Sequence, residues 1–317
     1  MGLKGIQEKE EHEKPHHLRT RHAAKVADPG PNDLRRMISR PITWRIGDRL
    51  VQLPAPRVMG ILNATPDSFH GASRVDVDGA LRLAERMLEE GASILDMGGA
   101  SSRPGSSVIT MEEELQRVLP VITAVHNRFP EALLSVDTWR SAVARAAVHA
   151  GAGLVNDIGA GLLDPDMLPT VAALHVPYIA MHMQGTPATM QLSPTYTDVA
   201  GEVTLFLSGR IRACKDAGIP DVIIDPGFGF GKTTAHNYRL LRELPRLCTL
   251  GAPVLVGLSR KRMVNEVLGI PPSEALNGTT ILNTLALLGG ATILRVHDVR
   301  EAMEVVKLMG RYLDEPA

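Results

Sequence analysis

The sequence is poor in cysteine and nearly balanced in charge, and each feature disfavours a class of protein. Its two cysteines, Cys214 and Cys248, lie far from any cluster of His and Cys residues, so we expect neither a disulfide scaffold nor a zinc site. This cysteine usage suggests a reducing cytoplasm. The formal net charge of -1 over 317 residues disfavours nucleic acid or an anionic membrane as a partner. Any anionic ligand must then be recognised by a local group of cations.

Long uninterrupted apolar runs are also missing. The amino terminus has no apolar segment of the kind found in secretory signals. The most apolar stretch, residues 279–296, is broken by Asn283 and by the pair Gly289 and Gly290, and it contains Arg295. This pattern indicates a buried helix followed by a strand rather than a membrane span.

Residues 1–40 differ in composition from the rest, with many charged side chains and few large apolar ones. Such a segment buries too little surface to offset the entropy of ordering it. We therefore expect a mobile, disordered tail, with an added helix as the alternative. Residues 43–53, TWRIGDRLVQL, alternate apolar and polar side chains about a Gly-Asp pair, which predicts a short hairpin. Residues 41–317 are expected to form one folded domain.

From residue 57 onward, apolar runs alternate with segments whose apolar residues recur at helical spacing. Parallel strands with helical crossovers form either a closed barrel or an open doubly wound sheet. Eight similar units in about 250 residues favour the closed α/β barrel, so the predicted fold is a (β/α)8 TIM barrel preceded by the hairpin. In the sixth unit, residues 235–247 are predicted to form the helix. The predicted strands are residues 58–64, 93–99, 133–138, 154–160, 177–183, 222–227, 253–260 and 292–299.

Polar side chains stand at the end of every predicted strand. After a single strand, such a residue is usually a turn former or a helix cap. After eight strands in succession, the pattern favours a shared site, because the carboxyl ends of parallel barrel strands meet at one rim. The residues expected to converge there, apart from a few that brace loops, are Asn63, Asp96, Asp137, Asn156, His182, Asp225, Ser259 with Arg260, and Arg295 with His297.

The segment DVIIDPGFGFGKTT, residues 221–234, has glycines that fit neither common phosphate-binding motif. A P-loop needs glycine five positions before Gly231, where Pro226 stands. Glycines at alternate positions also fail the dinucleotide fingerprint. We interpret this segment as a loop whose glycines let a flat ligand lie close to the backbone, with Asp225 at its base. Nothing in the pattern assigns a role to Lys232, for which exposure to solvent is the simple expectation.

Eight blocks of the sequence, in order, resemble the dihydropteroate synthase family. They are MGILNATPDSF (59–69), SSRPGS (101–106), SVDTWR (135–140), NDI (156–158), MHMQGTPATMQ (181–191), DPGFGFGK (225–232), GLSRK (257–261) and RVHDV (295–299). The resemblance implies a TIM barrel that joins 4-aminobenzoate to a dihydropterin carried as its hydroxymethyl diphosphate. The implied products are 7,8-dihydropteroate and pyrophosphate. It also implies assistance by Mg²⁺ and a homodimer formed through the later barrel helices.

The resemblance assigns one group of residues to the pterin. Asp225 and Asn156 suit an edge of ring amide and amino groups, and Lys261 matches a lysine that contacts the pterin. Asp137 matches a second pterin carboxylate and can stabilise positive charge on the ring when the diphosphate leaves. Asp96 either contacts the pterin or braces the glycines that follow it.

A second group is assigned to the diphosphate and to 4-aminobenzoate. Arg295 and His297 suit the leaving diphosphate, and Asn63 matches the residue that contacts Mg²⁺. Phe230 either walls the aminobenzoate ring or simply packs. From a loop expected to act as part of a lid, the family pattern adds Ser102, Arg103 and Pro104, and it implies that Asp137, Lys261 and Arg103 are the catalytic residues.

Three departures from the family pattern leave alternatives open. Ala100 replaces a common glutamate, residues 70–73 read HGAS, and Arg262 stands where a serine often meets the aminobenzoate carboxylate. Arg262 either binds that carboxylate or turns into solvent. Two competing functions are a methyltransferase of the related pterin-binding type and a non-catalytic paralogue that binds pterin or a protein partner. The cations favour the synthase, because the methyltransferase needs no diphosphate pocket.

Overall fold

The computed structural model describes residues 1–2, 41–53, 56–64, 76–100, 109–186 and 189–314. The predicted tail lies almost wholly outside the described residues. Ser102, Arg103 and Pro104 lie outside them as well.

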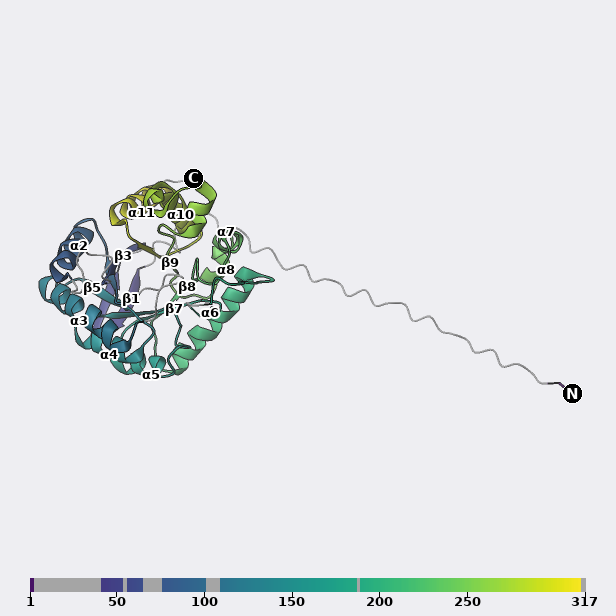
Figure 1. The fold of residues 1–317 in the computed structure, drawn as a ribbon, viewed down its shortest axis with the longest axis horizontal. Helices are drawn as coiled ribbons and strands as arrows, with labels where there is room; N and C mark the ends of the chain where they lie inside the picture. The colour runs from purple at the N-terminus through teal and green to yellow at the C-terminus, as the bar shows by residue number, and fades with distance from the viewer. Residues whose placement is uncertain (3–40, 54–55, 65–75, 101–108, 187–188, 315–317) are drawn as a thin grey trace.

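Eight parallel strands form the predicted barrel (Figure 1). Strand β10 pairs with both β9 and β3, and the remaining strands pair in sequence order from β3 to β8. A bridge between Ile224 and Val254 joins the two edges of the sheet. The (β/α)8 prediction is therefore confirmed. The strands are β3 (Arg57–Asn63), β4 (Ile94–Gly98), β5 (Leu133–Asp137), β6 (Leu154–Asp157), β7 (Tyr178–Met181), β8 (Val222–Asp225), β9 (Leu255–Val256) and β10 (Ile293–Val296).

Helices surround the strands (Figure 1), and the α-helices bury apolar side chains against them. In α2, for example, Ala80, Ala84 and Met87 recur at helical spacing and are buried. The helices are α2 (Val77–Glu89), α3 (Met111–Arg128), α4 (Ser141–His149), α5 (Met167–Leu174), α6 (Val199–Asp216), α7 (Thr234–Arg242), α8 (Leu244–Cys248), α9 (Arg262–Leu268), η2 (Pro272–Glu274), α10 (Leu276–Leu288) and α11 (Val299–Asp314).

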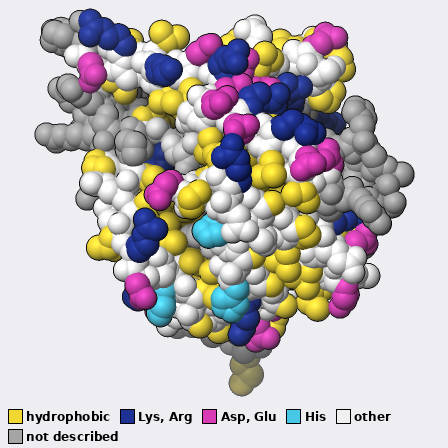
Figure 2. Space-filling view, turned by 90° about the vertical axis from the view of Figure 1, so that its left-hand side faces the viewer, with side chains coloured by type: hydrophobic (Ala, Val, Ile, Leu, Met, Phe, Trp, Pro, Cys, Tyr) yellow, Lys and Arg dark blue, Asp and Glu magenta, His cyan; other side chains and the backbone are white. Residues whose placement is uncertain are grey.

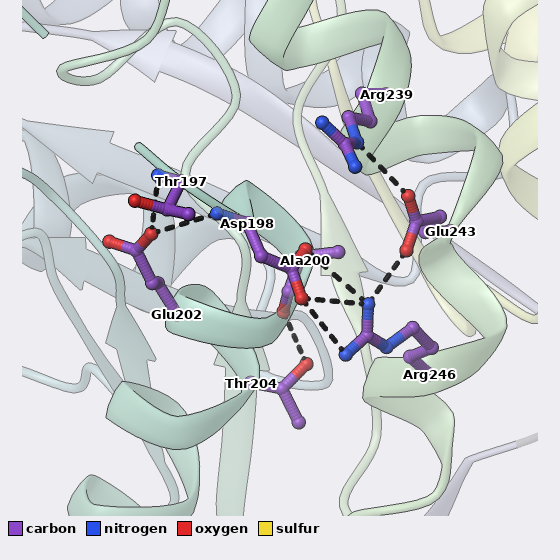
Figure 3. A network of polar contacts seen from close by, with 8 residues as sticks. All are labelled: Thr197, Asp198, Ala200, Glu202, Thr204, Arg239, Glu243 and Arg246. Atoms are coloured by element: carbon purple, nitrogen blue, oxygen red, sulfur yellow. Dashed lines mark hydrogen bonds and ion pairs between the residues drawn. The ribbon is translucent and has the colours of Figure 1, made fainter. Parts of the chain in front are cut away.

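The helix predicted for the sixth unit is divided into α7 and α8. Pro245 has no backbone N–H, which disfavours it in the interior of a helix, but it fits the first turn of a new one. Arg246 of α8 stabilises the junction between α7 and α8. It donates to Glu243 at 2.7 Å and to Asp198, the N-cap of α6, at 3.3 Å. Arg239 of α7 bonds the same glutamate (Figure 3).

The predicted hairpin is also confirmed, as strands β1 (Ile42–Ile46) and β2 (Arg49–Leu53). Its Trp44 is 1% exposed and packs among the innermost apolar side chains of the barrel, such as Ile94 and Ile293. Those residues begin their strands, so the hairpin closes the amino-terminal end of the barrel. A ligand therefore has to enter from the opposite rim.

The surface matches the balanced composition. On the face formed by α2 and α3, basic and acidic side chains are intermingled rather than separated into fields of one sign (Figure 2). Within the described residues, no helix combines the length and apolarity needed to cross a membrane.

Replacement of Trp44 tests the role of the hairpin. Trp44→Ala should lower the free energy of unfolding by about 3–5 kcal/mol, because it leaves a cavity in the barrel floor. Leu50→Ala, on the exposed side of the same hairpin, should change it by about 0.5 kcal/mol or less. Urea denaturation measures both, and equal effects would contradict a closing role for Trp44.

Candidate active site

Four polar side chains point into the barrel interior, because side-chain direction alternates along each strand. Asp96, Asn156, Asp225 and Arg295 each follow by two residues a side chain of the innermost apolar layer. They therefore lie above that layer, toward the carboxyl ends of the strands. The neighbouring Asp157 points to the other face, where it accepts a hydrogen bond from the Tyr178 hydroxyl at 2.6 Å.

Arg295 links two acids from other strands. Its Nε donates to Asp96 Oδ2 at 2.7 Å, and its Nη2 donates to Asp137 Oδ2 at 2.7 Å. Asn156 Nδ2 donates to the same Asp96 oxygen at 3.0 Å. The structure thus brings together four of the residues that were predicted to converge. Two of them, Asp96 and Asn156, are 60 positions apart in the chain.

The structure does not show the bracing role that the sequence left open for Asp96, and contact with the pterin stays a prediction. Its side chain is fully buried, and Oδ2 accepts from Arg295 and Asn156 rather than bracing the glycines that follow. Its Oδ1 has no hydrogen-bond partner within the described residues. The direct effect of Asp96 is to fix the orientation of Arg295 and Asn156.

Burial and the neighbouring charges act against each other on the pKa values of this group. Burial raises the pKa of Asp137 to about 7, although Arg295 opposes the shift. Burial by itself would lower the pKa of Arg295, but Asp96 and Asp137 outweigh it and raise that pKa. The guanidinium therefore stays charged, and its Nη1 makes no hydrogen bond within the described part of the chain. That nitrogen is available to an anionic ligand.

Asp225 lies on the other side of the barrel mouth. Its Oδ1 accepts from the Gly227 amide at 2.7 Å, and the side chain is nearly buried. Burial raises its pKa, whereas Lys261, the Gly227 hydrogen bond, Arg295 and Lys232 oppose the increase.

The glycines after Asp225 serve the chain itself. All three, at 227, 229 and 231, have positive φ angles. A Cβ atom on Gly227 would lie 1.8 Å from the His182 carbonyl oxygen, and one on Gly231 would lie 2.5 Å from that of Gln184. At these two positions, glycine lets the loop lie against the segment after β7. The close approach of neighbouring backbone therefore requires glycine at 227 and 231, without any contact with a ligand.

Two lysines are gathered at this loop. Lys261 donates to the Phe228 carbonyl oxygen, and its Nζ lies 5.0 Å from the centre of the half-buried Phe230 ring. Burial lowers the pKa of Lys261 to about 8.

Lys232 is the residue that the sequence analysis missed. The expectation of exposure was wrong, because Lys232 is 3% exposed and its Nζ bonds His182 Nδ1 at 2.9 Å. Burial lowers its pKa to about 7. The signal that could have found it is its position directly after the alternating glycines, which fold the loop inward.

The other rim residues differ in their contacts and exposure. His297 follows β10, and its ring Nδ1 lies 3.1 Å from Ser259 Oγ. Arg260 braces the chain through two hydrogen bonds to Asp298. Arg262 is 79% exposed and pairs with Glu266 at 3.0 Å, so in this structure it lies in solvent.

A complete metal cage is absent from the described residues, where no three His, Cys, Asp or Glu side chains are grouped to hold an ion. Asn63, at the end of β3, is half-buried, and its side chain makes no hydrogen bond within the described residues. It offers one neutral oxygen, which suits a hard cation that is held mainly by a ligand.

The similarity to known proteins agrees with this geometry. Residues 59–297 match the family model described as pterin binding enzyme. The dihydropteroate synthase of Haemophilus influenzae is 45% identical over 264 residues, which cover 82% of this chain and 95% of that protein. The chain belongs to the dihydropteroate synthase family.

Solved structures of the dihydropteroate synthase family share the fold. The Xanthomonas albilineans enzyme with 4-aminobenzoic acid has a TM-score of 0.80 and 46% identity, covering 87% of this chain and all of that one. The same enzyme in complex with 7,8-dihydropteroate has a TM-score of 0.78 and 43% identity, with the same coverage. Membership of the dihydropteroate synthase family makes the chain a transferase of folate biosynthesis.

Replacement of Arg295 by lysine tests the link between the two acids. Lysine keeps the charge but cannot bond both carboxylates in the forked geometry. Arg295→Lys should therefore lower the free energy of unfolding by about 1–3 kcal/mol, because one buried acid loses its partner.

The matched control is Arg300→Lys, since the exposed Arg300 forms an ion pair with Glu90. It should change the free energy of unfolding by about 0.5 kcal/mol or less. Chemical denaturation compares the two variants, and similar losses would contradict the linking role of Arg295.

Proposed function

We propose that the barrel mouth joins 4-aminobenzoate to (7,8-dihydropterin-6-yl)methyl diphosphate. The C–O bond to the diphosphate breaks, a C–N bond to the arylamine forms, and pyrophosphate and the amine proton are released. The observation that carries this proposal is the convergence of Asp96, Asp137, Asn156 and Arg295 at one rim. The ligands of the related Xanthomonas enzyme support it.

Recognition of the pterin is assigned to Asp225 and Asn156, with Lys261 and Asp96 beside them. Asp225 uses Oδ1 to hold Gly227, which leaves Oδ2 for an N–H of the pterin edge. Asn156 donates to Asp96, so its amide oxygen is oriented to accept from the ligand. Both side chains are nearly buried, which strengthens such hydrogen bonds.

Ionisation of the pterin is assigned to charges on its two sides. The Asp137 carboxylate stabilises the positive charge that spreads over the ring as the diphosphate leaves. Arg295 can offer Nη1 to the diphosphate while Asp96 and Asp137 hold its other nitrogens. His297 is assigned to the same anion, and Lys261 is assigned to catalysis with Asp137. Arg103 completes the catalytic set, and Ser102 and Pro104 are proposed to close over the substrates; all three lie outside the described residues.

Mg²⁺ is the proposed cofactor, with Asn63 Oδ1 as its protein ligand. Bound there, the ion would neutralise negative charge on the departing diphosphate. The lone neutral amide fits this role, because Mg²⁺ at phosphate sites keeps few protein ligands.

Phe230 is proposed to wall the aminobenzoate ring, because its half-buried phenyl group lies beside Lys261 at the barrel mouth. Sulfonamides, which resemble aminobenzoate, would compete there. The two unpaired cysteines, Cys214 and Cys248, support a cytoplasmic location.

Pyrophosphate release tests the proposed reaction. Purified protein with Mg²⁺, 4-aminobenzoate and the pterin diphosphate should release pyrophosphate and form dihydropteroate. Asp225→Ala should abolish pterin binding, because it leaves buried ligand donors unpaired. Release no faster than without protein would contradict the synthase, and methyl transfer from methyl-tetrahydrofolate would favour the methyltransferase instead.

The raised pKa of Asp137 predicts a pH dependence. Protonation at low pH removes the negative charge assigned to the transition state, so kcat/KM should fall about tenfold per pH unit below about pH 7. Asp137→Asn should be much less active and should lose this acid limb. A variant that retains the same limb would contradict the assignment to Asp137.

A homodimer is proposed on an apolar surface of the last helices. Ile281 and Leu285 of α10 and Leu308 and Tyr312 of α11 are exposed at helical spacing, and the two helices pack together. An exposed apolar surface of this kind is typical of an interface.

Leu285→Arg should shift the mass measured by light scattering from dimer to monomer, because it places a charge in the interface. Leu205→Arg is the control, since Leu205 is exposed on α6 and should leave the mass unchanged. A dimeric Leu285→Arg protein would contradict this interface.

A further inference from the structure

We propose that Lys232 is a positioning residue of the pterin site, which fixes the loop of residues 225–231 from within through hydrogen bonds to that loop and to His182. The proposal rests on the proposed function, because it assigns to this loop the presentation of Asp225 and Phe230. Neither the family resemblance nor the charge pattern of the sequence gave Lys232 a part in the site.

The Lys232 ammonium has three protons and three close acceptors, with the His182 carbonyl oxygen as a fourth, more distant one at 3.5 Å. Its Nζ lies 2.9 Å from His182 Nδ1, 2.9 Å from the Gly227 carbonyl oxygen and 3.0 Å from the Phe230 carbonyl oxygen. His182 follows β7, and the two carbonyl groups belong to the loop after β8. One side chain therefore ties the loop to the end of the adjacent strand.

The His182 ring is suited to accept this bond. Burial and the neighbouring Lys232 lower the pKa of His182 to about 3, so the ring is neutral. A neutral imidazole that accepts at Nδ1 carries its proton on Nε2. The ring is also held by an edge contact with Phe206, at 4.9 Å between ring centres.

The two loop residues whose carbonyl oxygens accept from Lys232 also position the groups that are assigned to substrate binding. Gly227 donates to Asp225 Oδ1 and so fixes that carboxylate. Phe230 carries the ring that lies beside Lys261. The charge of Lys232 acts in the same direction, since with Lys261 and Arg295 it opposes the rise in the pKa of Asp225 that burial causes.

Direct contact between Lys232 and the substrate does not fit the geometry. The side chain is 3% exposed, and each ammonium proton already has an acceptor. Lys232 therefore acts through the loop, and its removal should weaken pterin binding more than it slows turnover at saturation.

Two substitutions of His182 distinguish the effect of its hydrogen bond to Lys232 from the effect of its packing. Asparagine places an amide oxygen near the position of Nδ1 and can still accept from Lys232, whereas leucine fills the space without an acceptor. Lys232→Met removes the donor. Lys215→Met, at an exposed position on α6, is the control.

The first measurement is the Kd of dihydropterin by calorimetry on the full chain, together with KM and kcat. Lys232→Met and His182→Leu should raise Kd and the KM for the pterin diphosphate about tenfold, with kcat changed by less than about threefold. His182→Asn and Lys215→Met should stay within about threefold of the starting protein. An unchanged Kd in Lys232→Met would overturn the proposal, as would a loss of kcat alone.

The second measurement is amide hydrogen exchange over residues 225–232, which needs no substrate. Exchange should be faster in Lys232→Met and His182→Leu than in His182→Asn. Equal exchange rates in the two His182 variants would overturn the proposal. If Lys232→Met does not fold, the comparison of these two variants alone tests the proposal. A starting protein that binds no pterin would contradict the proposed function, whereas exchange reports on the positioning role alone.

Discussion

The interaction on which the barrel mouth depends is the pairing of Arg295 with Asp96 and Asp137. Removing three charges from water is costly, and the cost is offset only when geometry and hydrogen bonding are favourable. The forked guanidinium meets that requirement by bonding one acid through Nε and the other through Nη2, while Asn156 gives Asp96 a second donor. Strands β4, β5, β6 and β10 are thereby tied together at the rim without a ligand.

The opposite side of the mouth is organised by lysines. Lys261 and Lys232 hold the loop after β8 by bonding its carbonyl oxygens, and that loop fixes Asp225. The mouth holds acidic and basic side chains in equal number: the acids are Asp96, Asp137 and Asp225, and the bases are Arg295, Lys261 and Lys232. Such a site suits a flat heterocycle with many donors and an anionic tail, because acids and cations are both fixed before binding.

The sequence predicted much of this because parallel barrels impose simple rules on it. Apolar runs marked the strands, and a polar residue at each strand end marked the rim, so Asp137, Asn156 and Arg295 were placed correctly at one mouth. Periodicity does not specify which rim residues bond one another, since that depends on strand register and side-chain direction. The partners of Asp96 could therefore not be named from the sequence.

Burial of Lys232 was missed because a lysine is normally exposed, and only a folded loop can surround one with acceptors. The glycines at 227 and 231 carried that information, but their tight approach to the segment after β7 is visible only in three dimensions. The break between α7 and α8 was also missed, because apolar residues recur at helical spacing on both sides of Pro245, and a proline does not always end a helix: α3 continues through Pro120.

A crystal structure of the chain with dihydropterin bound tests the central claim most directly. The account predicts that the edge of the pterin ring meets the Asp225 carboxylate and the Asn156 amide, while Arg295 keeps its bonds to Asp96 and Asp137. A pterin bound away from this mouth, or an Arg295 that releases both acids when the pterin binds, would contradict it.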